Sequence, residues 1–488
     1  MTKQNAEPTT GTTAEEVGRL AEAAVRAFAV TAAADAETRG RWLRAIADEL
    51  DANTDALIEV GDSETALGST RLRGEVARTT GQLRLFADVI AEGSYLEAVI
   101  DHAAPEATPP RPDLRRMLRP IGPIAVFAAS NFPFAFSVAG GDTASALAVG
   151  CPVIVKTHPG HPELSRMTAG LVAGALASAG APDGTFALID GYDAGLALVD
   201  HAAVQAVAFT GSVAGGQALH DRAAARPAPI PFFGELGSIN PVVVTPAADA
   251  ARGGDLAEGL AGSFQLGAGQ FCTKPGVVFV PPGSTIERSL PARVAGGGQR
   301  LLTDSITSGF HSGIDRLLAV PGVEVVAGSP GADGSAAPVV LAVDASALDA
   351  HGEELLAEVF GPVTLLVRYG DGELEAALST LEGSLTATLH AEADDDVDAT
   401  LARLEEIAGR VLFTGWPTGV AVTWSQHHGG PWPSTTSSHT SVGATAVRRF
   451  QRPIAYQDAP DGRLPAALRE SNPLGIPRRV DGRFIPSE

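Results

Sequence analysis

The sequence of 488 residues predicts an α/β protein built from two doubly wound parallel sheets. Short apolar runs alternate with helical segments from residue 124 to residue 219, and a second alternating unit follows from residue 239. Such alternation is typical of strand–helix–strand units, whose right-handed crossovers make the strands parallel. The length is sufficient for two or three domains, each with a core of its own.

The composition excludes several classes of protein. With 45% hydrophobic and 19% charged residues, the chain has the composition of a globular protein. A formal net charge of −22 argues against nucleic acid or an anionic membrane surface as the main partner. The first 16 residues lack the apolar core of a signal peptide, and no run of 18 uncharged apolar residues occurs. Two cysteines give no disulfide framework, so we expect a cytoplasmic protein.

The first alternating unit places polar residues where its strands end. Asn131, Lys156 and the pair Gly211-Ser212 lie at or just beyond the ends of expected strands. Ligands of doubly wound sheets bind beyond the carboxyl ends of the strands, so these residues are candidates for a binding site. The expected strands are 124–128, 152–156, 185–189 and 204–209.

The regions on either side follow from periodicity and turn residues. Residues 14–59 and 63–92 are predicted to be helical because apolar side chains recur at helical spacing. A proline-rich stretch at 103–112 breaks this pattern, and residues 111–119 carry four arginines in a possible edge strand or arm. In the second unit we expect helices at 256–265, 374–381 and 397–407, and strands at 239–244, 276–280, 323–326, 339–343, 363–367 and 410–413.

Cys272 lies in a loop with glycines on one side and a Pro-Gly turn on the other. A thiol attacks as the thiolate, and its ordinary pKa is about 8.5. Backbone amides of the loop and a nearby cation would favour the thiolate and could bind an oxyanion. The alternative is a small buried hydrophobic residue, which is our interpretation of Cys151.

Three further residues have side chains suited to chemistry. Glu235 follows an apolar strand, where desolvation would raise its pKa toward the range of a general base. Asn131 could donate a hydrogen bond to a developing oxyanion, and Lys156 could reach a phosphate or a ribose. Each also has a structural interpretation, as a paired carboxylate, a turn former and a surface charge.

Together these residues belong to six motifs that occur in one order along the chain. The motifs are Asn131-Phe132-Pro133, Val155-Lys156, Phe209-Thr210-Gly211-Ser212 with Gly216, Glu235-Leu236-Gly237 with Asn240-Pro241, Gln270-Phe271-Cys272-Thr273 with Pro275-Gly276, and Glu358-Val359-Phe360-Gly361-Pro362. On these motifs the sequence resembles the aldehyde dehydrogenase superfamily over nearly its whole length. The agreement of six motifs makes a purely structural role for Cys272 an unlikely interpretation.

The resemblance implies an aldehyde dehydrogenase-like fold with a cofactor domain, a catalytic domain and a small oligomerisation arm. It implies a cofactor-binding domain at 1–234, with an oligomerisation hairpin near 100–122. Residues 235–425 would form the catalytic domain. Residues 426–488 would return to the cofactor domain and end in a C-terminal oligomerisation arm. A homodimer or a homotetramer is expected.

The resemblance also implies a mechanism. Cys272 adds to an aldehyde carbonyl, while Asn131 and the Cys272 backbone N–H stabilise the alkoxide. Hydride passes to a nicotinamide and leaves a thioester. Glu235 then activates the water that releases the acid.

The expected cofactor is NADP, although NAD is possible. NAD-preferring relatives commonly have a glutamate three residues after the strand-end lysine, where it binds the ribose 2′-hydroxyl. Here that position is Pro159, so a 2′-phosphate becomes acceptable beside Lys156. The cofactor-binding residues implied by the resemblance are Lys156, His158, Pro159, Gly211, Ser212, Gly216, Glu358 and Phe360.

The substrate prediction rests on segments 130–137, 140–147, 416–420 and 428–433 and on the C-terminal tail. They resemble the branch that contains 2-oxoglutarate semialdehyde (2,5-dioxopentanoate) dehydrogenases. The distal carboxylate of such a substrate needs a cation, which the sequence does not place. The expected substrate-pocket residues are Phe132, Phe134, Phe271 and Trp424.

Other functions stay open at this point. A related branch oxidises long-chain aliphatic aldehydes with NADP, and Cys272 with Glu235 alone would suit a thioester hydrolase. A non-catalytic relative is a further alternative, against which the retained Cys272 and Glu235 argue. No metal site is expected, because His158 and His161 lie among prolines. The pair His427-His428 is interpreted as a loop or pocket wall.

Overall fold

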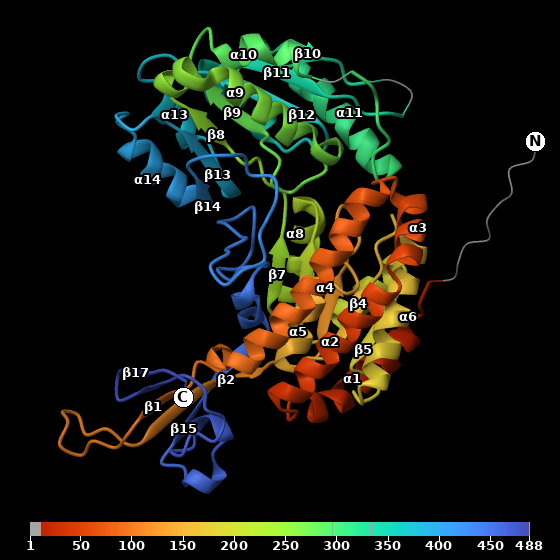
Figure 1. Ribbon diagram of the computed structural model, residues 1–488, viewed down its shortest axis with the longest axis vertical. Coiled ribbons are helices and arrows are strands. Elements are labelled where there is room, and N and C mark those ends of the chain that lie inside the picture. The colour runs from red at the N-terminus through yellow and green to blue at the C-terminus, as the bar shows by residue number, and fades with distance from the viewer. Residues whose placement is uncertain (1–10, 295, 332–333, 488) are drawn as a thin grey trace, which may run out of the picture.

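Three β-sheets organise the chain in the computed structural model, which describes residues 11–294, 296–331 and 334–487. Two of the sheets are the centres of stacked α/β domains, and the third forms an arm that projects from the lower domain (Figure 1). The α/β class and the parallel, doubly wound sheets predicted from the sequence are confirmed.

The N-terminal region forms helices that cover the first sheet. The segment expected as one helical region, 14–59, is divided where polar side chains cap new helices. Thr13 and Asp35 accept hydrogen bonds from the backbone N–H groups of Glu16 and Thr38. The helices are α1 (Ala14–Thr31), α2 (Ala36–Ala52), α3 (Thr54–Thr65) and α4 (Ser69–Glu92).

The first sheet is entirely parallel and has the strand order β5-β4-β3-β6-β7. The chain moves outward from β3 to β5 and then returns to the other side of β3, so β3 and β6 flank the topological switch point. A ligand crevice is expected there, beyond the carboxyl ends of the strands. The strands are β3 (Ile124–Phe127), β4 (Val153–Lys156), β5 (Phe186–Ile189), β6 (Ala206–Thr210) and β7 (Phe232–Glu235), and the helices are α5 (Gly141–Val149), α6 (Pro162–Ser178), α7 (Tyr192–Asp200) and α8 (Val213–Ala224).

The second sheet has the order β10-β11-β12-β9-β8-β13-β14 and is parallel except for the edge strand β10. Its strands are β8 (Val242–Val244), β9 (Val277–Val280), β10 (Glu324–Gly328), β11 (Val339–Asp344), β12 (Val363–Arg368), β13 (Ser384–His390) and β14 (Ala408–Leu412). Its helices are α9 (Pro246–Gln265), α10 (Thr285–Ser289), α11 (Asp304–Leu318), α12 (Leu348–Leu356), α13 (Leu374–Ser379) and α14 (Asp398–Ile407). Strand β13 and helix α11 are not among the elements predicted from the sequence. In β13 all seven residues are buried although three are Ser or Thr, so the strand lacks the continuous apolar run that marks buried parallel strands.

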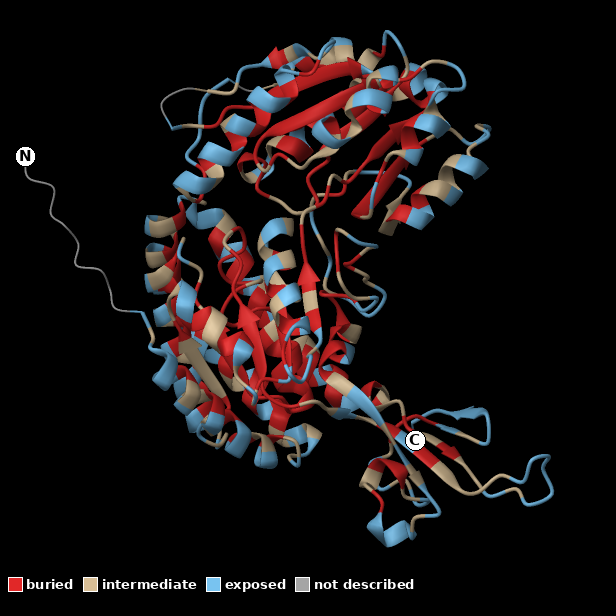
Figure 2. Cartoon of the chain, turned by 180° about the vertical axis from the view of Figure 1, so that it is seen from behind, coloured by how far each residue is buried: buried red, intermediate tan, exposed pale blue. Residues whose placement is uncertain are grey.

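The arm is a five-stranded sheet that joins two distant parts of the chain, in the order β15-β2-β1-β16-β17. Much of its surface is exposed, whereas the central strands of the two domain sheets are buried (Figure 2). Its strands are β1 (Val99–Asp101), β2 (Leu114–Pro120), β15 (Gln451–Gln457), β16 (Arg478–Val480) and β17 (Arg483–Ile485).

Residues 413–443 lead from the second domain back to the first without forming a helix or a strand of more than one residue (Figure 1). This return segment lies against β7, where Leu236 N donates to Ser434 O at 2.8 Å and Gly234 N donates to Thr436 Oγ1 at 2.8 Å. It therefore brings C-terminal side chains to the end of β7. None of the helices in the described residues combines the length and hydropathy that a membrane crossing requires.

Candidate active site

Cys272 lies where the two domains meet, in a loop that follows α9 and a short 3₁₀ turn. Gly269 has a φ of 68°, and a Cβ on it would come within 2.2 Å of the Gly361 carbonyl oxygen. Only glycine fits this approach. Asn240 fixes the far side of the loop, because its Nδ2 donates to Cys272 O at 2.8 Å and to Lys274 O at 3.0 Å.

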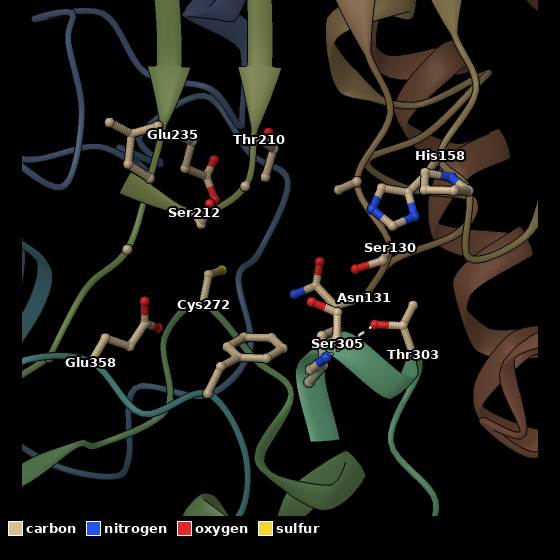
Figure 3. Close-up of a pocket in the computed structure, with 17 residues that line it drawn as sticks. Ser130, Asn131, His158, Thr210, Ser212, Glu235, Cys272, Thr303, Ser305 and Glu358 are labelled. Atoms are coloured by element: carbon tan, nitrogen blue, oxygen red, sulfur yellow. Dashed lines mark hydrogen bonds between the residues drawn. The ribbon is translucent and has the colours of Figure 1, made fainter. Parts of the chain in front are cut away.

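Glu235, Asn131 and Cys272, the three predicted catalytic residues, line one cavity (Figure 3). Glu235 stands at the end of β7, Asn131 follows β3, and both side chains are buried. Asn131 Nδ2 donates to Gln270 O at 3.2 Å, which ties the Asn131 loop to the Cys272 loop. An amide nitrogen carries two N–H donors, so one remains for a substrate oxygen.

His428 lies beside Glu235 and Cys272, whereas the sequence predicted only a loop or pocket wall for the pair His427-His428. Its Nε2 lies 3.0 Å from Glu235 Oε1 and 3.6 Å from Cys272 Sγ. Its Nδ1 is buried and has no hydrogen-bond partner among the described residues. A hydrogen on Nε2 would therefore allow His428 to donate to Glu235 Oε1.

The side chains of Glu235, Cys272 and His428 also offer a carboxylate, a thiol and an imidazole within 4.8 Å of one another, the one such group of possible metal ligands among the described residues. A metal ion bound there would use the Cys272 sulfur as a ligand, so the sulfur could not also act as a free nucleophile. The arrangement therefore fits a nucleophile with its acid–base partner. The rings of His158 and His161 stack with their centroids 5.6 Å apart. Both His161 nitrogens contact protein atoms, Ser165 Oγ and Ala129 O, so this histidine has a structural role.

The electrostatics of the group differ from the sequence-based expectation. Burial raises the pKa of the Glu235 carboxyl as predicted, but the charge of His428 and hydrogen bonds from His428, Ser441 and Cys272 outweigh it, so the pKa lies below its usual value. Burial and the adjacent Glu235 carboxylate raise the pKa of the Cys272 thiol well above 9. The prediction that the loop favours the thiolate is wrong for this state, because a carboxylate lies beside the sulfur. The Cys272 thiol and the Glu235 carboxylate therefore lie side by side.

The larger cavity at this centre has a volume of about 590 Å³ and opens beyond the switch point of the first sheet. Ser212 caps the N-terminus of α8 by accepting from Gly215 N at 3.2 Å, and the other N–H groups of the first turn remain available to an anion. Of the predicted cofactor-binding residues, the cavity is lined by His158, Pro159, Gly211, Ser212, Glu358 and Phe360.

Lys156 and Gly216 do not line this cavity. Lys156 ends β4, and burial lowers the pKa of its ammonium group. Gly216 lies inside α8, where a Cβ would approach Leu236 Cδ2 to 2.2 Å, so its role is close packing behind a lining residue.

A buried lysine positions the segment that carries Glu358. Lys274 Nζ donates to Val359 O at 3.2 Å and to Val363 O at 2.7 Å. Burial raises the pKa of Glu358 to about 7 against the opposing effect of Lys274. Lys274 and Val359 each lie in or beside a motif found in the sequence, but the sequence does not predict that they contact each other.

A second, narrow cavity of about 30 Å³ also touches Cys272. Of the residues expected in the substrate pocket, Phe132 and Phe271 line this cavity. Phe134 lies instead in the core of the first domain, because Glu75 Oε1 accepts the backbone N–H of Phe134 at 2.8 Å and turns the ring inward. Trp424 is 49% exposed and lines neither cavity. The full lining is Arg78, Phe132, Phe136, Phe271, Cys272, Thr273, Gly419 and Val420.

Known proteins resemble this chain in sequence and in fold. The aldehyde dehydrogenase family pattern matches residues 2–292. The chain is 49% identical to alpha-ketoglutaric semialdehyde dehydrogenase 2 of Azospirillum brasilense, covering 96% of this chain and 91% of the relative. It is 42% identical to alpha-ketoglutaric semialdehyde dehydrogenase of Acinetobacter baylyi, with the same coverage. The fold matches aldehyde dehydrogenase 21 of Physcomitrella patens in complex with succinate, at a TM-score of 0.77 and 20% identity over 93% and 92% of the two chains. The chain therefore belongs to the aldehyde dehydrogenase family and is an aldehyde dehydrogenase.

Proposed function

We propose that this enzyme oxidises 2-oxoglutarate semialdehyde (2,5-dioxopentanoate) to 2-oxoglutarate with NADP. The observation that carries the proposal is the similarity to two relatives named for this semialdehyde, at 49% and 42% identity over 96% of the chain. The geometry around Cys272 suits the chemistry, since a thiol, a carboxylate base and an amide donor line one cavity.

The larger cavity fits a nicotinamide dinucleotide. A Cβ on Gly211 would come within 2.6 Å of the Phe209 ring, so glycine keeps the chain open in front of α8. The N-terminus of α8 would hold the pyrophosphate, and the Glu358 carboxylate would hold a ribose hydroxyl. When bound, the nicotinamide supplies the acceptor for the hydride.

The preference for NADP rests on the residues beyond β4. Pro159 lines the cavity at the position where a carboxylate would repel a 2′-phosphate, and His158 lies beside it. Lys156 adds a cation behind them, which favours a phosphate over a hydroxyl.

In the proposed mechanism, the Cys272 thiol gives its proton to Glu235, and the thiolate adds to the aldehyde carbon. His428 is a positioning residue, because its Nε2–H holds Glu235 and lies beside the sulfur. Asn131 donates to the oxygen that becomes the alkoxide. Collapse of the alkoxide with loss of hydride leaves a thioester on Cys272.

Hydrolysis of the thioester completes the cycle. Glu235 first releases the thiol proton to solvent and is then free to take a proton from water. The resulting hydroxide attacks the thioester carbon, the carbon–sulfur bond breaks, and the sulfur regains a proton from Glu235. The products are the carboxylic acid and the original thiol.

We also propose that the enzyme is a cytoplasmic homodimer or homotetramer that assembles through the arm. The edge strand β17 exposes Phe484 (63%) and Ile485 (43%), which would pair with another chain. Both cysteines are unpaired, in keeping with a reducing compartment. Light scattering during gel filtration should give two or four chains, and Phe484→Asp should lower that number. A monomeric wild type would contradict the assembly.

The function is tested by the absorbance of the reduced nicotinamide with a panel of aldehydes. We expect kcat/KM for 2,5-dioxopentanoate with NADP to exceed that for hexanal by about 100-fold, and NADP to exceed NAD by about tenfold. Cys272→Ala is the control and should abolish the signal. Equal rates on the two aldehydes would reject the substrate, and absence of reduction with every aldehyde would reject the dehydrogenase mechanism.

A further inference from the structure

Helix α4 presents three charged residues on one face beside the active site. Arg71, Glu75 and Arg78 are spaced at i, i+4 and i+7, so their side chains emerge in a row. All three contact the loop of residues 131–136 or its aromatic rings. None of them belongs to a motif found in the sequence.

Two members of this row are committed to the protein itself. Glu75 is buried, and its Oε1 accepts from the backbone N–H groups of Phe134 at 2.8 Å and Ala135 at 3.1 Å. Arg71 Nη2 donates to Asn131 O at 2.6 Å, and its guanidinium lies 4.9 Å from the Phe271 ring centroid. These two residues therefore shape the loop that carries Asn131.

Arg78 is different, because its guanidinium forms no hydrogen bond or ion pair with any described residue. Its Nε is buried without a partner, and its Cζ lies 5.5 Å and 5.3 Å from the ring centroids of Phe132 and Phe136. The side chain lines the narrow cavity together with Cys272. The negative charge of Glu75 acts on Arg78 without forming an ion pair with it, so an anion bound to the guanidinium would further offset the cost of its desolvation.

The other cation near this cavity, Arg410, is also committed. Its Nη1 and Nη2 donate to Gly419 O at 3.1 Å and Pro417 O at 2.7 Å, which supports the wall that Gly419 forms. Arg71 Nη1 and Arg410 Nε also lack partners, but each of those guanidiniums forms at least one hydrogen bond, whereas that of Arg78 forms none with the described residues.

We infer that Arg78 binds the carboxylate at the far end of the aldehyde substrate. The inference rests on the proposed function and names the substrate class as short, unbranched ω-oxo acids. A guanidinium can donate two parallel hydrogen bonds to a carboxylate, and the rings of Phe132, Phe136 and Phe271 would enclose the carbon chain between them. A neutral aliphatic tail in the same place would leave Arg78 buried and unpaired.

The test compares Arg78→Met with a matched control, Arg73→Met, on the same helix. Arg73 is exposed and pairs with Asp55 at 2.6 Å, away from both cavities. For Arg78→Met we expect kcat/KM for 2,5-dioxopentanoate to fall about 100-fold, chiefly through KM, while kcat/KM for pentanal changes less than about threefold. Arg78→Lys keeps the charge but loses the fork, so the loss should be about tenfold. Arg73→Met should leave both aldehydes unchanged.

The outcomes separate this inference from the proposed function. If Arg78→Met left the ratio of kcat/KM for 2,5-dioxopentanoate to kcat/KM for pentanal unchanged, whether or not both values fell, the role of Arg78 would be overturned. The wild type tests the substrate: a preference for a shorter or longer ω-oxo acid would reject 2,5-dioxopentanoate. If Arg78→Met then lost that preference, the role of Arg78 as the anion site would still stand. Thermal melting of each variant checks that the fold is intact.

Discussion

The two cavities that meet at Cys272 are built in different ways. The proposed cofactor side has a volume of about 590 Å³, and strand ends, two glycines and a helix N-terminus are among the parts that line it, so backbone groups contribute to its surface. The proposed substrate side is smaller, and three aromatic rings and one arginine make up half of its eight lining residues, so side chains make much of its surface. Backbone suits a ligand shared by many enzymes, whereas side chains adapt the other cavity to one aldehyde class.

The shared centre is where a single change should affect both sides most. In Glu235→Gln the proposed general base is lost, so we expect steady-state turnover to fall about 100-fold or more. The first turnover should still yield a burst of reduced nicotinamide, but more slowly than in wild type, because the thiol must then lose its proton to solvent. Rapid mixing followed at the reduced-nicotinamide band measures both phases. An unchanged steady-state rate would contradict the role of Glu235 as the base for hydrolysis.

The same variant tests the charge on Glu235. After burial, the Glu235 carboxylate is the next cause that raises the pKa of the Cys272 thiol, so removing its negative charge should lower that pKa. The rate of alkylation by iodoacetamide, measured against pH, should therefore show its midpoint at lower pH in Glu235→Gln than in wild type. A midpoint that stays or rises would mean that burial alone controls the thiol.

A second change should affect the cofactor side alone. In Gly216→Ala the new Cβ meets Leu236, which lines the larger cavity, so α8 or Leu236 must shift. We expect KM for the dinucleotide to rise about tenfold and KM for the aldehyde to change less than about twofold. Gly170→Ala in α6 is the control, because no atom outside that helix lies within 4 Å of its Cβ. Equal changes in both KM values would show that the two cavities are not independent.

The contrast also explains what the sequence could predict. Cys272, Glu235 and Gly211-Ser212 lie in short motifs next to strand ends, so local pattern was enough to bring them to one site. Arg78 and His428 reach Cys272 only through tertiary structure, from a helix 194 residues before it and from the return segment 156 residues after it. A lone arginine in a helix carries no local signal of that kind.

Ring orientation was likewise beyond the sequence. Phe132, Phe134 and Phe136 alternate along one loop, and their order alone does not say which rings face the substrate. The orientation follows from the buried Glu75 of α4, which accepts the Phe134 backbone N–H. Phe132 and Phe136 therefore line the cavity at Cys272, and Phe134 enters the core.

The smallest expected effect concerns the boundary of the proposed substrate pocket, the narrow cavity at Cys272. Trp424 is half exposed and lines neither cavity, so Trp424→Ala should change kcat/KM for 2,5-dioxopentanoate less than about twofold and stability by about 0.5 kcal/mol or less. Phe136→Ala is the matched comparison, because it removes a ring that both lines the narrow cavity and lies under the Arg78 guanidinium. That variant should raise KM about tenfold, since Arg78 loses a surface that holds it in place. If Trp424→Ala were the more damaging of the two, the return segment would have to close over the substrate, and the boundary of the specificity pocket would extend beyond the rings around Cys272.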